Sequence, residues 1–339
     1  MKVLFIGGTG TISMAITKLL AGQGHELYLL NRGNRNEGLP ANVKTIIADI
    51  SNEEETAAKL EGMNFDCVGE FIGFVPAQLE RDFRLFRDKT KQFIYISSAS
   101  AYQKPPKGYR ITEETPLENP YWEYSRNKKA CEEYLLERYQ KDGFPVTIVR
   151  PSHTYDERGI PLGVHGNGGS WQIVKRIKEG KPVIIHGDGT SLWTITHNSD
   201  FAVAYAGLIG NPKAIGEIFH ITSDESLSWN EIYGAIADAL GVTLKPYYVS
   251  SRLLADLGDY DFEGSLIGDK ANSVVFDNSK IKSLVPEFRA KISAREGIRM
   301  TVENVLAHPE YQTEDPEFDA WTDRVIEAVE KMKKDFRQG

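Results

Sequence analysis

Apolar residues along this chain form two alternating patterns: short continuous blocks, and longer stretches in which they recur at helical spacing. The first block spans residues 3–6, and after it Ile12, Ile16 and Leu20 recur at helical spacing. A short apolar block fits a strand that is buried on both faces of a parallel sheet, and the spaced residues fit a helix. Their alternation predicts an α/β fold with a doubly wound parallel sheet.

The same patterns predict most of the remaining elements. Strands are expected over residues 25–30, 43–48, 66–71, 91–96, 182–185, 217–222 and 244–249. Helices are expected over residues 76–87, 121–140, 171–179, 200–208, 229–240 and 316–336. On the last helix one face carries an apolar stripe, which is expected to pack into the core rather than against a partner. The stripe consists of Trp321, Val325, Ile326, Val329 and Met332.

A glycine-rich turn lies between the first predicted strand and the first predicted helix. It contains Gly7, Gly8 and Gly10, with Ser13 at the third glycine position of the dinucleotide-binding fingerprint. Gly7 permits a sharp turn because glycine adopts positive φ without steric cost, and Gly10 lets the backbone approach a pyrophosphate. The helix N-terminus then offers free N–H groups and the positive end of its dipole. The turn therefore predicts a dinucleotide cofactor. The alternatives are a tight turn in a mononucleotide site and an α/β domain that holds no nucleotide.

The end of the second predicted strand selects the sugar of the adenosine half of such a cofactor. A carboxylate there would bind the ribose 2′-hydroxyl of NAD, but this chain has Asn31 and Arg32, with Arg35 close behind. Because a guanidinium can make two contacts with a 2′-phosphate, NADP is favoured over NAD. NAD bound through Asn31 beside a solvated loop is the alternative. Asp49, after the third strand, either faces the adenine or caps the helix that begins near Asn52.

Hydroxyl groups and a lysine are expected at the ligand-binding edge of the sheet. Residues 97–102 are rich in serine and follow the strand at 91–96, and open α/β sheets bind ligands at the carboxyl ends of their strands. Tyr124 and Lys128 are four residues apart on a predicted helix, so they share one face. A lysine ammonium near a tyrosine hydroxyl stabilises the phenolate and lowers the tyrosine pKa. Tyr124 is therefore a candidate for proton transfer near neutral pH.

Composition and charge exclude several other classes of protein. The chain has 339 residues, is 41% hydrophobic and 26% charged, and carries a formal net charge of -8 at pH 7. These values are typical of a globular protein and argue against a general nucleic-acid binder. No apolar run is long enough to cross a bilayer and no signal peptide is visible, so we expect a cytoplasmic protein. Cys67 and Cys131 lack metal-ligand spacing, so we expect no metal and two buried core cysteines.

The chain resembles the extended short-chain dehydrogenase/reductase superfamily and, within it, the NAD-dependent epimerase/dehydratase family. The matching segments are residues 7–13, 97–102, 124–128, 150–151, 186–189 and 196–200. The resemblance implies that Tyr124 takes a proton from a substrate hydroxyl, that Ser98 holds the substrate oxygen, and that Lys128 also binds the nicotinamide ribose. It implies cofactor contacts from Gly7, Gly10, Thr11, Ile12, Asn31, Arg32, Asp49, Ile50, Phe71, Gly73, Lys128 and Pro151.

The second half departs from the resemblance where nucleotide-sugar enzymes hold the substrate diphosphate. The family pattern has an asparagine after the sixth strand and an arginine shortly before the histidine that matches His197, and this chain has His153 and Trp193 there. Losing a fixed cation weakens the case for a diphosphate substrate. The expected substrate contacts are Ser98, Ser100, His153 and Trp193. A structural role is an equal alternative for His153, and packing is the favoured alternative for Trp193.

The resemblance implies an NAD(P)-dependent enzyme with two lobes. Residues 1–156 plus about 198–222 would form the dinucleotide-binding domain, and about 157–197 plus 223–339 a smaller α/β substrate-binding lobe. The expected reaction is the transient oxidation of a sugar or nucleotide-sugar hydroxyl, as in an epimerase or dehydratase. The alternatives are a net NADP-dependent reductase or dehydrogenase of a small carbonyl or alcohol, and an RNA-binding member of the same fold. A homodimer through helices that include residues 121–140 is also expected.

Overall fold

The computed structural model describes residues 1–338, which form two compact units. Unit 1 consists of residues 1–154, 194–224 and 275–291, and unit 2 of residues 155–193, 225–274 and 292 onward. Each unit therefore combines segments that are far apart in the sequence. The dinucleotide and substrate roles expected for the two lobes stay predictions.

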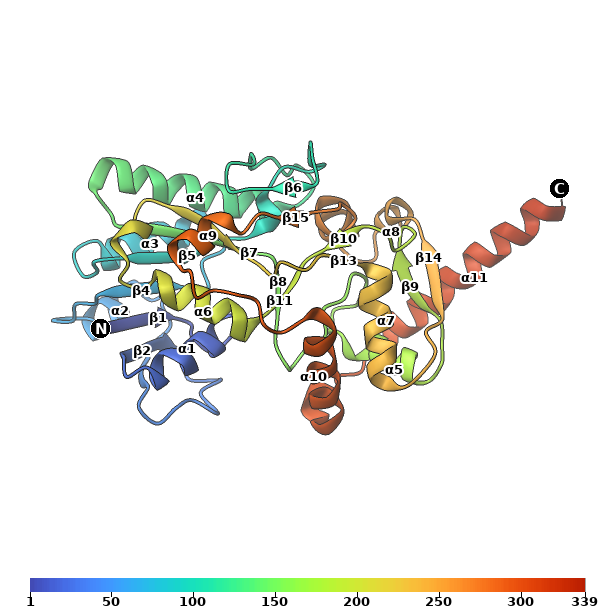
Figure 1. Cartoon of the computed structure of the whole chain (residues 1–339), viewed down its shortest axis with the longest axis horizontal. Helices are drawn as coiled ribbons and strands as arrows, with labels where there is room; N and C mark the ends of the chain where they lie inside the picture. Colours follow the sequence, from blue (N-terminus) through green and yellow to red (C-terminus); the bar gives the residue numbers. More distant parts are fainter. Residues whose placement is uncertain (339) are drawn as a thin grey trace. The chain divides into compact units, whose positions relative to one another are not determined.

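Unit 1 is built on a seven-stranded parallel sheet with the strand order β12-β7-β5-β4-β1-β2-β3 (Figure 1). Its strands are β1 (Lys2–Ile6), β2 (Glu26–Asn31), β3 (Lys44–Ile47), β4 (Cys67–Glu70), β5 (Phe93–Ile96), β7 (Val146–Pro151) and β12 (Ile218–Ile221). The carboxyl ends of parallel strands meet at one edge of the sheet. The chain winds outward from β1 in both directions, so β1 marks the switch point at which such sheets bind ligands. The predicted doubly wound α/β class is confirmed.

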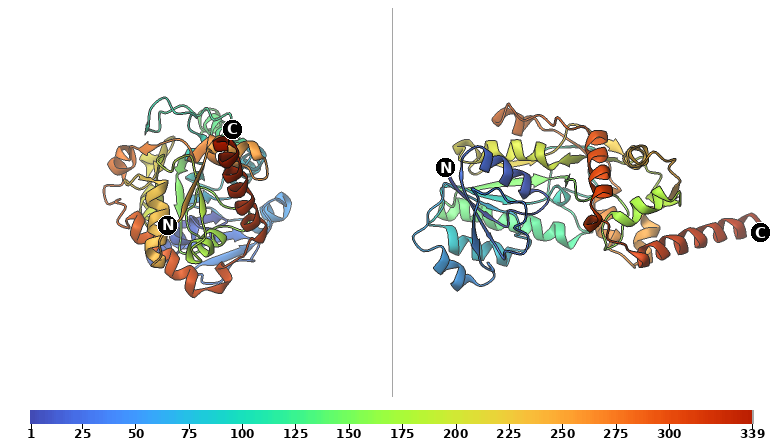
Figure 2. Two further views of the ribbon diagram at one scale, coloured as in Figure 1. Left: turned by 90° about the vertical axis from the view of Figure 1, so that its right-hand side faces the viewer. Right: turned by 90° about the horizontal axis from the view of Figure 1, so that it is seen from below.

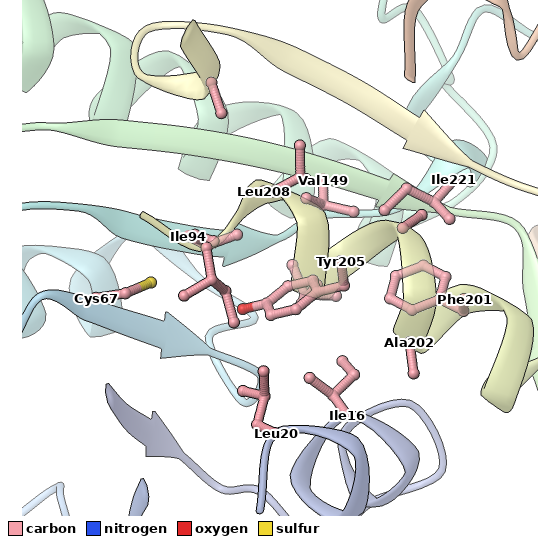
Figure 3. Close-up of a cluster of buried hydrophobic side chains, with 14 of the residues drawn as sticks. Ile16, Leu20, Cys67, Ile94, Val149, Phe201, Ala202, Tyr205, Leu208 and Ile221 are labelled. Atoms are coloured by element: carbon pink, nitrogen blue, oxygen red, sulfur yellow. The ribbon is translucent and has the colours of Figure 1, made fainter. Parts of the chain in front are cut away.

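Helices cover both faces of this sheet because the side chains of its strands alternate between the faces. Val3 and Phe5 of β1 join the core formed with α1 (Ser13–Gly22) and α6 (Asn198–Leu208). Figure 3 shows Ile16 of α1 and Tyr205 of α6 converging there on the sheet. The intervening β1 residues join the second core, formed with α3 (Pro76–Phe86) and α4 (Glu123–Asp142).

Unit 2 combines helices with short strands. The strands β9 (Val183–His186) and β14 (Pro246–Val249) pair in parallel, and β10 (Leu192–Trp193) pairs with β13 (Leu227–Ser228). Its helices are α5 (Trp171–Lys178), α7 (Trp229–Leu240), α8 (Ser251–Leu257), η3 (Glu263–Lys270), α10 (Ala294–Ala307), η4 (Pro309–Tyr311) and α11 (Pro316–Gln338), the last of which is the dark red helix in Figure 2. The remaining elements of the chain are α2 (Glu53–Lys59), η1 (Ala99–Ala101), β6 (Arg110–Ile111), β8 (His153–Tyr155), β11 (Ile195–His197), η2 (Pro212–Ala214), β15 (Val275–Phe276) and α9 (Ser279–Leu284).

The predicted elements are all present, with ends that differ by a few residues. The sequence patterns did not predict the helices between residues 250 and 315. The stripe on α11 is split: Trp321 is 2% exposed and Val325 7%, but Met332 is 61% exposed. The prediction that Met332 packs into the core is therefore wrong, since this side chain is exposed in the single chain.

Two further predictions concern the core and the membrane. Cys67 and Cys131 are buried free thiols, as expected. Across residues 1–338, no helix has the length and apolar character needed to span a membrane.

Candidate active site

A cavity of about 1010 Å³ lies in unit 1 at the carboxyl edge of the sheet. The ends of six strands and parts of α1, α3 and α4 contribute to its lining. The predicted cofactor contacts that line it are Gly7, Gly10, Thr11, Ile12, Asn31, Arg32, Asp49, Ile50, Phe71, Lys128 and Pro151. The structure thus brings together every predicted cofactor contact except Gly73.

The glycine-rich turn enters the cavity between β1 and α1. Gly7 and Gly8 have φ angles of 100° and 91°, in the region that favours glycine. A Cβ on Gly8 would lie 2.5 Å from a methyl carbon of Leu29, so the turn is also tightly packed. The Gly10 N–H donates to Ser13 Oγ at 2.9 Å, which shows how serine replaces the third glycine of the fingerprint.

The first turn of α1 is suited to an anion. Its N-cap residue, Ile12, provides no side-chain cap, and the first turn holds no acidic residue. The amide groups at this helix start therefore lack a side-chain acceptor. Such a helix N-terminus favours a phosphate or diphosphate.

The loop after β2 carries the predicted sugar-selecting residues. Asn31 Oδ1 accepts the Gly33 N–H at 2.8 Å, and Asn31 Nδ2 donates to Asn36 Oδ1 at 2.9 Å. Asn31 therefore shapes the loop that places Arg32 and Arg35 in the lining.

The two interpretations of Asp49 are separated by the start of α2. Asn52 accepts the Glu55 N–H and caps this helix, whereas Asp49 Oδ1 accepts from the N–H and hydroxyl of Ser51 at 3.0 and 2.6 Å. These hydrogen bonds, together with nearby Arg32, lower the pKa of Asp49. Asp49 is thus not the cap, and it lies in the cavity lining.

Ser98 is the first of three serine hydroxyl groups that hydrogen bonds link in series. Its Oγ lies 2.9 Å from Ser100 Oγ, which in turn accepts the Ser125 hydroxyl at 2.8 Å. Asn119 Nδ2 donates a hydrogen bond to the Ser100 carbonyl oxygen at 2.7 Å. Ser98 lines the cavity, whereas Ser100 is 5% exposed and lies outside the lining. The structure therefore places Ser100 behind Ser98, and its contact with a substrate stays a prediction.

Lys128 is buried beside Tyr124. Its Nζ donates to the carbonyl oxygens of Gly73 at 2.7 Å and Ile96 at 2.8 Å, and lies 5.7 Å from the centroid of the Tyr124 ring. Burial lowers the pKa of Lys128 to about 8. Gly73 is thus an anchor for Lys128, and a Cβ on it would lie 3.0 Å from a Leu79 methyl carbon. Close packing is one reason for a glycine at this position, and its contact with a cofactor stays a prediction.

The two substrate contacts predicted in the second half have different environments. His153 is half-buried and lines the cavity of unit 1. Trp193 belongs to unit 2, is 5% exposed and stacks on Trp229 with the ring centroids 5.8 Å apart. The favoured packing interpretation of Trp193 agrees with this arrangement.

Several lining residues were not predicted from the sequence. Phe74 follows Gly73 and is 46% exposed, and Gln78 and Arg81 extend from α3 into the lining. Asn198 Nδ2 donates to the Thr11 carbonyl at 2.9 Å and so holds the glycine-rich turn. Asn198 lies within a segment that carries the family resemblance, but that signal gave no role for its side chain.

A model of the NAD dependent epimerase/dehydratase family matches residues 3–222. The chain is 24% identical over 292 residues to 2'-dehydrokanamycin reductase of Streptomyces kanamyceticus, covering 86% of this chain and 81% of that protein. It is 28% identical over 254 residues to chloroplast stem-loop binding protein of 41 kDa b of Arabidopsis thaliana, covering 71% and 63%. It is 25% identical over 214 residues to UDP-glucose 4-epimerase of Mycolicibacterium smegmatis, covering 63% and 62%. The chain thus spans slightly less than two thirds of the last two proteins.

Solved structures share the fold over most of the chain. UDP-glucuronic acid 4-epimerase from Bacillus cereus, in complex with UDP-glucuronic acid and NAD, gives a TM-score of 0.72 at 18% identity, covering 91% of this chain and 99% of that one. The dTDP-glucose 4,6-dehydratase from Bacillus anthracis, in complex with NAD, gives 0.71 at 19% identity, covering 91% and 98%.

Proposed function

The chain belongs to the NAD-dependent epimerase/dehydratase family of enzymes, and from that premise we propose that it transiently oxidises a hydroxyl-bearing carbon of a sugar or nucleotide sugar. In this proposal unit 1 binds the dinucleotide and unit 2 is the substrate lobe. The observation that carries the proposal is the meeting of Ser98, Tyr124 and Lys128 in one cavity with the glycine-rich turn.

The residues around the turn fit an NAD(P) cofactor. Gly8 keeps the turn close to Leu29 of β2, and the start of α1 has no side-chain cap that would compete with a diphosphate. A bound NAD(P) would supply reversible hydride transfer at the substrate carbon.

The side chains of this chain then divide the proton chemistry. Tyr124 takes the proton of the substrate hydroxyl, and the Lys128 ammonium beside its ring favours the phenolate. Ser98 hydrogen-bonds the substrate oxygen, and the Ser100 and Ser125 hydroxyls fix its orientation. The two carbonyl oxygens on Lys128 keep the ammonium in place during turnover.

The preference for NADP over NAD remains part of this proposal. Arg32 and Arg35 line the cavity, and the end of β2 has no carboxylate. A guanidinium suits a 2′-phosphate. The similar solved structures named above hold NAD, so the preference rests on the two arginines alone.

The proposed substrate class is broader than the substrate that any one relative's name gives. Named relatives include a UDP-glucose 4-epimerase and a dehydrokanamycin reductase, whose substrates carry sugar rings. In this chain Trp193 packs on Trp229 where the family pattern has an arginine for the diphosphate. A sugar without a diphosphate is therefore included. A homodimer through α4 and a cytoplasmic location stay predictions.

One experiment separates the alternatives: denature the purified protein and identify the released nucleotide by chromatography and mass. An epimerase or dehydratase keeps its cofactor through the cycle, whereas a reductase exchanges it at each turnover. Near-stoichiometric NAD+ would support the proposal and contradict the NADP preference. A protein that is purified empty and binds NADPH reversibly would favour a net reductase. A protein that neither holds nor binds a dinucleotide would overturn the proposal, and salt-dependent retention on immobilised RNA would then favour the RNA-binding alternative.

A further inference from the structure

Two buried carboxyl groups, Glu70 and Asp82, lie behind the cavity wall and have no part in the proposed chemistry. Glu70 is the last residue of β4, Asp82 lies on α3, and both are 0% exposed. Their carboxyl groups are within hydrogen-bonding reach of each other. Among residues 1–338, no donor group reaches Glu70 Oε2 or Asp82 Oδ2. Two such buried carboxyl groups can share a hydrogen bond only if one of them carries a proton.

The other two oxygens show which residue carries that proton. Asp82 Oδ1 accepts from Nε and Nη2 of Arg81 at 2.9 and 2.7 Å. Among residues 1–338, the one donor to Glu70 Oε1 is the backbone N–H of Ile72, at 2.5 Å. A guanidinium stabilises the carboxylate that it contacts, so Asp82 is the ionised partner and Glu70 the acid.

The surroundings of Glu70 agree with this assignment. Burial and the neighbouring Asp82 charge raise the pKa of Glu70 well above its usual range, and burial raises the pKa of Asp82 to about 6. Lys128, whose charge interacts with Glu70, donates to carbonyl oxygens instead. The titratable groups around the pair are Arg81 on α3, Glu53 on α2, Tyr95 on β5, Lys128 and Cys131 on α4, and Tyr205 on α6.

The acid is linked to the active site through the bend after β4. Glu70 Oε1 accepts the Ile72 N–H. The residue after Ile72 is Gly73, whose carbonyl oxygen accepts from Lys128 Nζ. A Cβ on Gly73 would lie 3.2 Å from Glu70 Cγ, so the glutamate stem also supports this bend.

We propose that Glu70, kept as a neutral carboxylic acid by hydrogen bonding to Asp82, is a positioning residue that fixes the Gly73 carbonyl and so orients Lys128 toward Tyr124. The role in positioning rests on the proposed function, because it matters for a site in which Lys128 contacts the cofactor. The protonation of Glu70 can be tested without it.

Substitutions at the two carboxyl groups should have unequal effects. In Glu70→Gln, the amide oxygen can accept the Ile72 N–H while the amide nitrogen donates to Asp82, as the acid does. In Asp82→Asn, one carbonyl oxygen replaces two acceptors, so either Arg81 or Glu70 loses its partner. We expect the NADPH dissociation constant, measured by fluorescence titration, to stay within about threefold of wild type in Glu70→Gln and to rise about tenfold in Asp82→Asn and Glu70→Ala. Equal weakening in Glu70→Gln and Glu70→Ala would overturn the proposal.

The pH dependence of unfolding provides a second readout. A carboxyl group with a raised pKa binds a proton more tightly in the folded state, so its contribution to stability is lost as pH rises above the ordinary glutamate value toward the folded-state pKa. Glu70→Gln cannot titrate. Its stability relative to wild type should therefore increase steadily from pH 5 to pH 9 in denaturant unfolding.

Glu80→Gln is the matched control, because it makes the same change at an exposed carboxylate on α3, the helix that carries Asp82. Its stability relative to wild type should not change in this way. A pH-independent difference between Glu70→Gln and wild type would mean that Glu70 is ionised in the fold, which overturns the inference even if Asp82→Asn fails to fold. If wild type binds no dinucleotide, the proposed function and the positioning role fail together, while the pH readout still decides the protonation of Glu70.

Discussion

The two sides of β1 contribute opposite kinds of surface to the same cavity. On the side of β4, β5 and β7 the strands are fully buried, and Lys128 is 1% exposed with both of its acceptors on the backbone. On the other side β3 is a largely exposed edge strand, and Arg32 and Arg35 are exposed. Buried polar groups must find partners inside the protein, whereas exposed ones are satisfied by water. The structure therefore constrains the position of Lys128 on the buried side closely. It constrains the cofactor contacts of Arg32 and Arg35 on the exposed side less.

The largest expected effect is on the buried side. Tyr124→Phe removes the proton-transfer group, and general acid–base catalysis contributes about 10²- to 10⁴-fold to rate, so turnover should fall by about that factor. The measurement is turnover with a panel of sugars and nucleotide sugars, with NADPH binding measured in parallel. Tyr124→Phe should bind NADPH nearly as wild type does, whereas Lys128→Met should lose both turnover and affinity. Turnover that survives Tyr124→Phe would assign proton transfer to another group and break the comparison.

The next effect tests the turn at β1 itself. Gly8→Ala forces a positive φ on a residue with a Cβ and places that carbon 2.5 Å from Leu29. Gly24→Ala is the matched control, because Gly24 also has a positive φ of 78° but nothing lies within 4 Å of its added carbon. We expect Gly24→Ala to lower the free energy of unfolding by about 1 kcal/mol, and Gly8→Ala to lower it by at least about 1 kcal/mol more and to weaken dinucleotide binding. Equal losses of stability would show that strain in φ, and not close packing, fixes this turn.

The signals that could be found in the sequence were local ones. Tyr124 and Lys128 lie one helical turn apart, and the glycine-rich turn follows directly on a strand. This local spacing, together with the serine-rich strand end and the family resemblance, predicted them as site residues. The contact between Asn198 and the Thr11 carbonyl joins residues 187 positions apart, and no pattern along the chain reports it. Glu70 lies within the strand predicted at residues 66–71, and no pattern along the chain reports that it is buried beside Asp82.

A periodic pattern also cannot report where a surface ends. Trp321 and Met332 occupy the same stripe of α11, yet only the first has a core to pack against. The stripe predicted the helix correctly, because helical spacing is a property of the sequence. How much of it is covered depends on the rest of unit 2.

On the exposed side we expect a smaller and more selective effect of substitution. Arg32→Ala should weaken NADPH binding about tenfold and leave NADH binding within about twofold, because only NADPH carries the 2′-phosphate. Fluorescence titration with both dinucleotides measures this directly. Arg35→Ala shows whether the second arginine shares the contact. Equal loss of affinity for both dinucleotides in Arg32→Ala would mean that the arginine supports the loop rather than the phosphate, and the NADP preference would lose its basis.

The smallest expected effect is a dependence on salt. It compares the buried side and the exposed side of the cavity within one protein. Raising the ionic strength from about 0.05 to 0.5 M shortens the screening length from about 14 to 4 Å, which weakens contacts between solvated charges. The NADPH dissociation constant should rise about threefold more than that of NADH, and Arg32→Ala should remove this difference. The rate of the chemical step in a single turnover should stay nearly constant, because Lys128 is 1% exposed and screening ions do not reach it. A chemical step that slows with salt as much as NADPH binding weakens would place the lysine in solvent during turnover, and the contrast between a buried catalytic side and an exposed selective side would not describe the working enzyme.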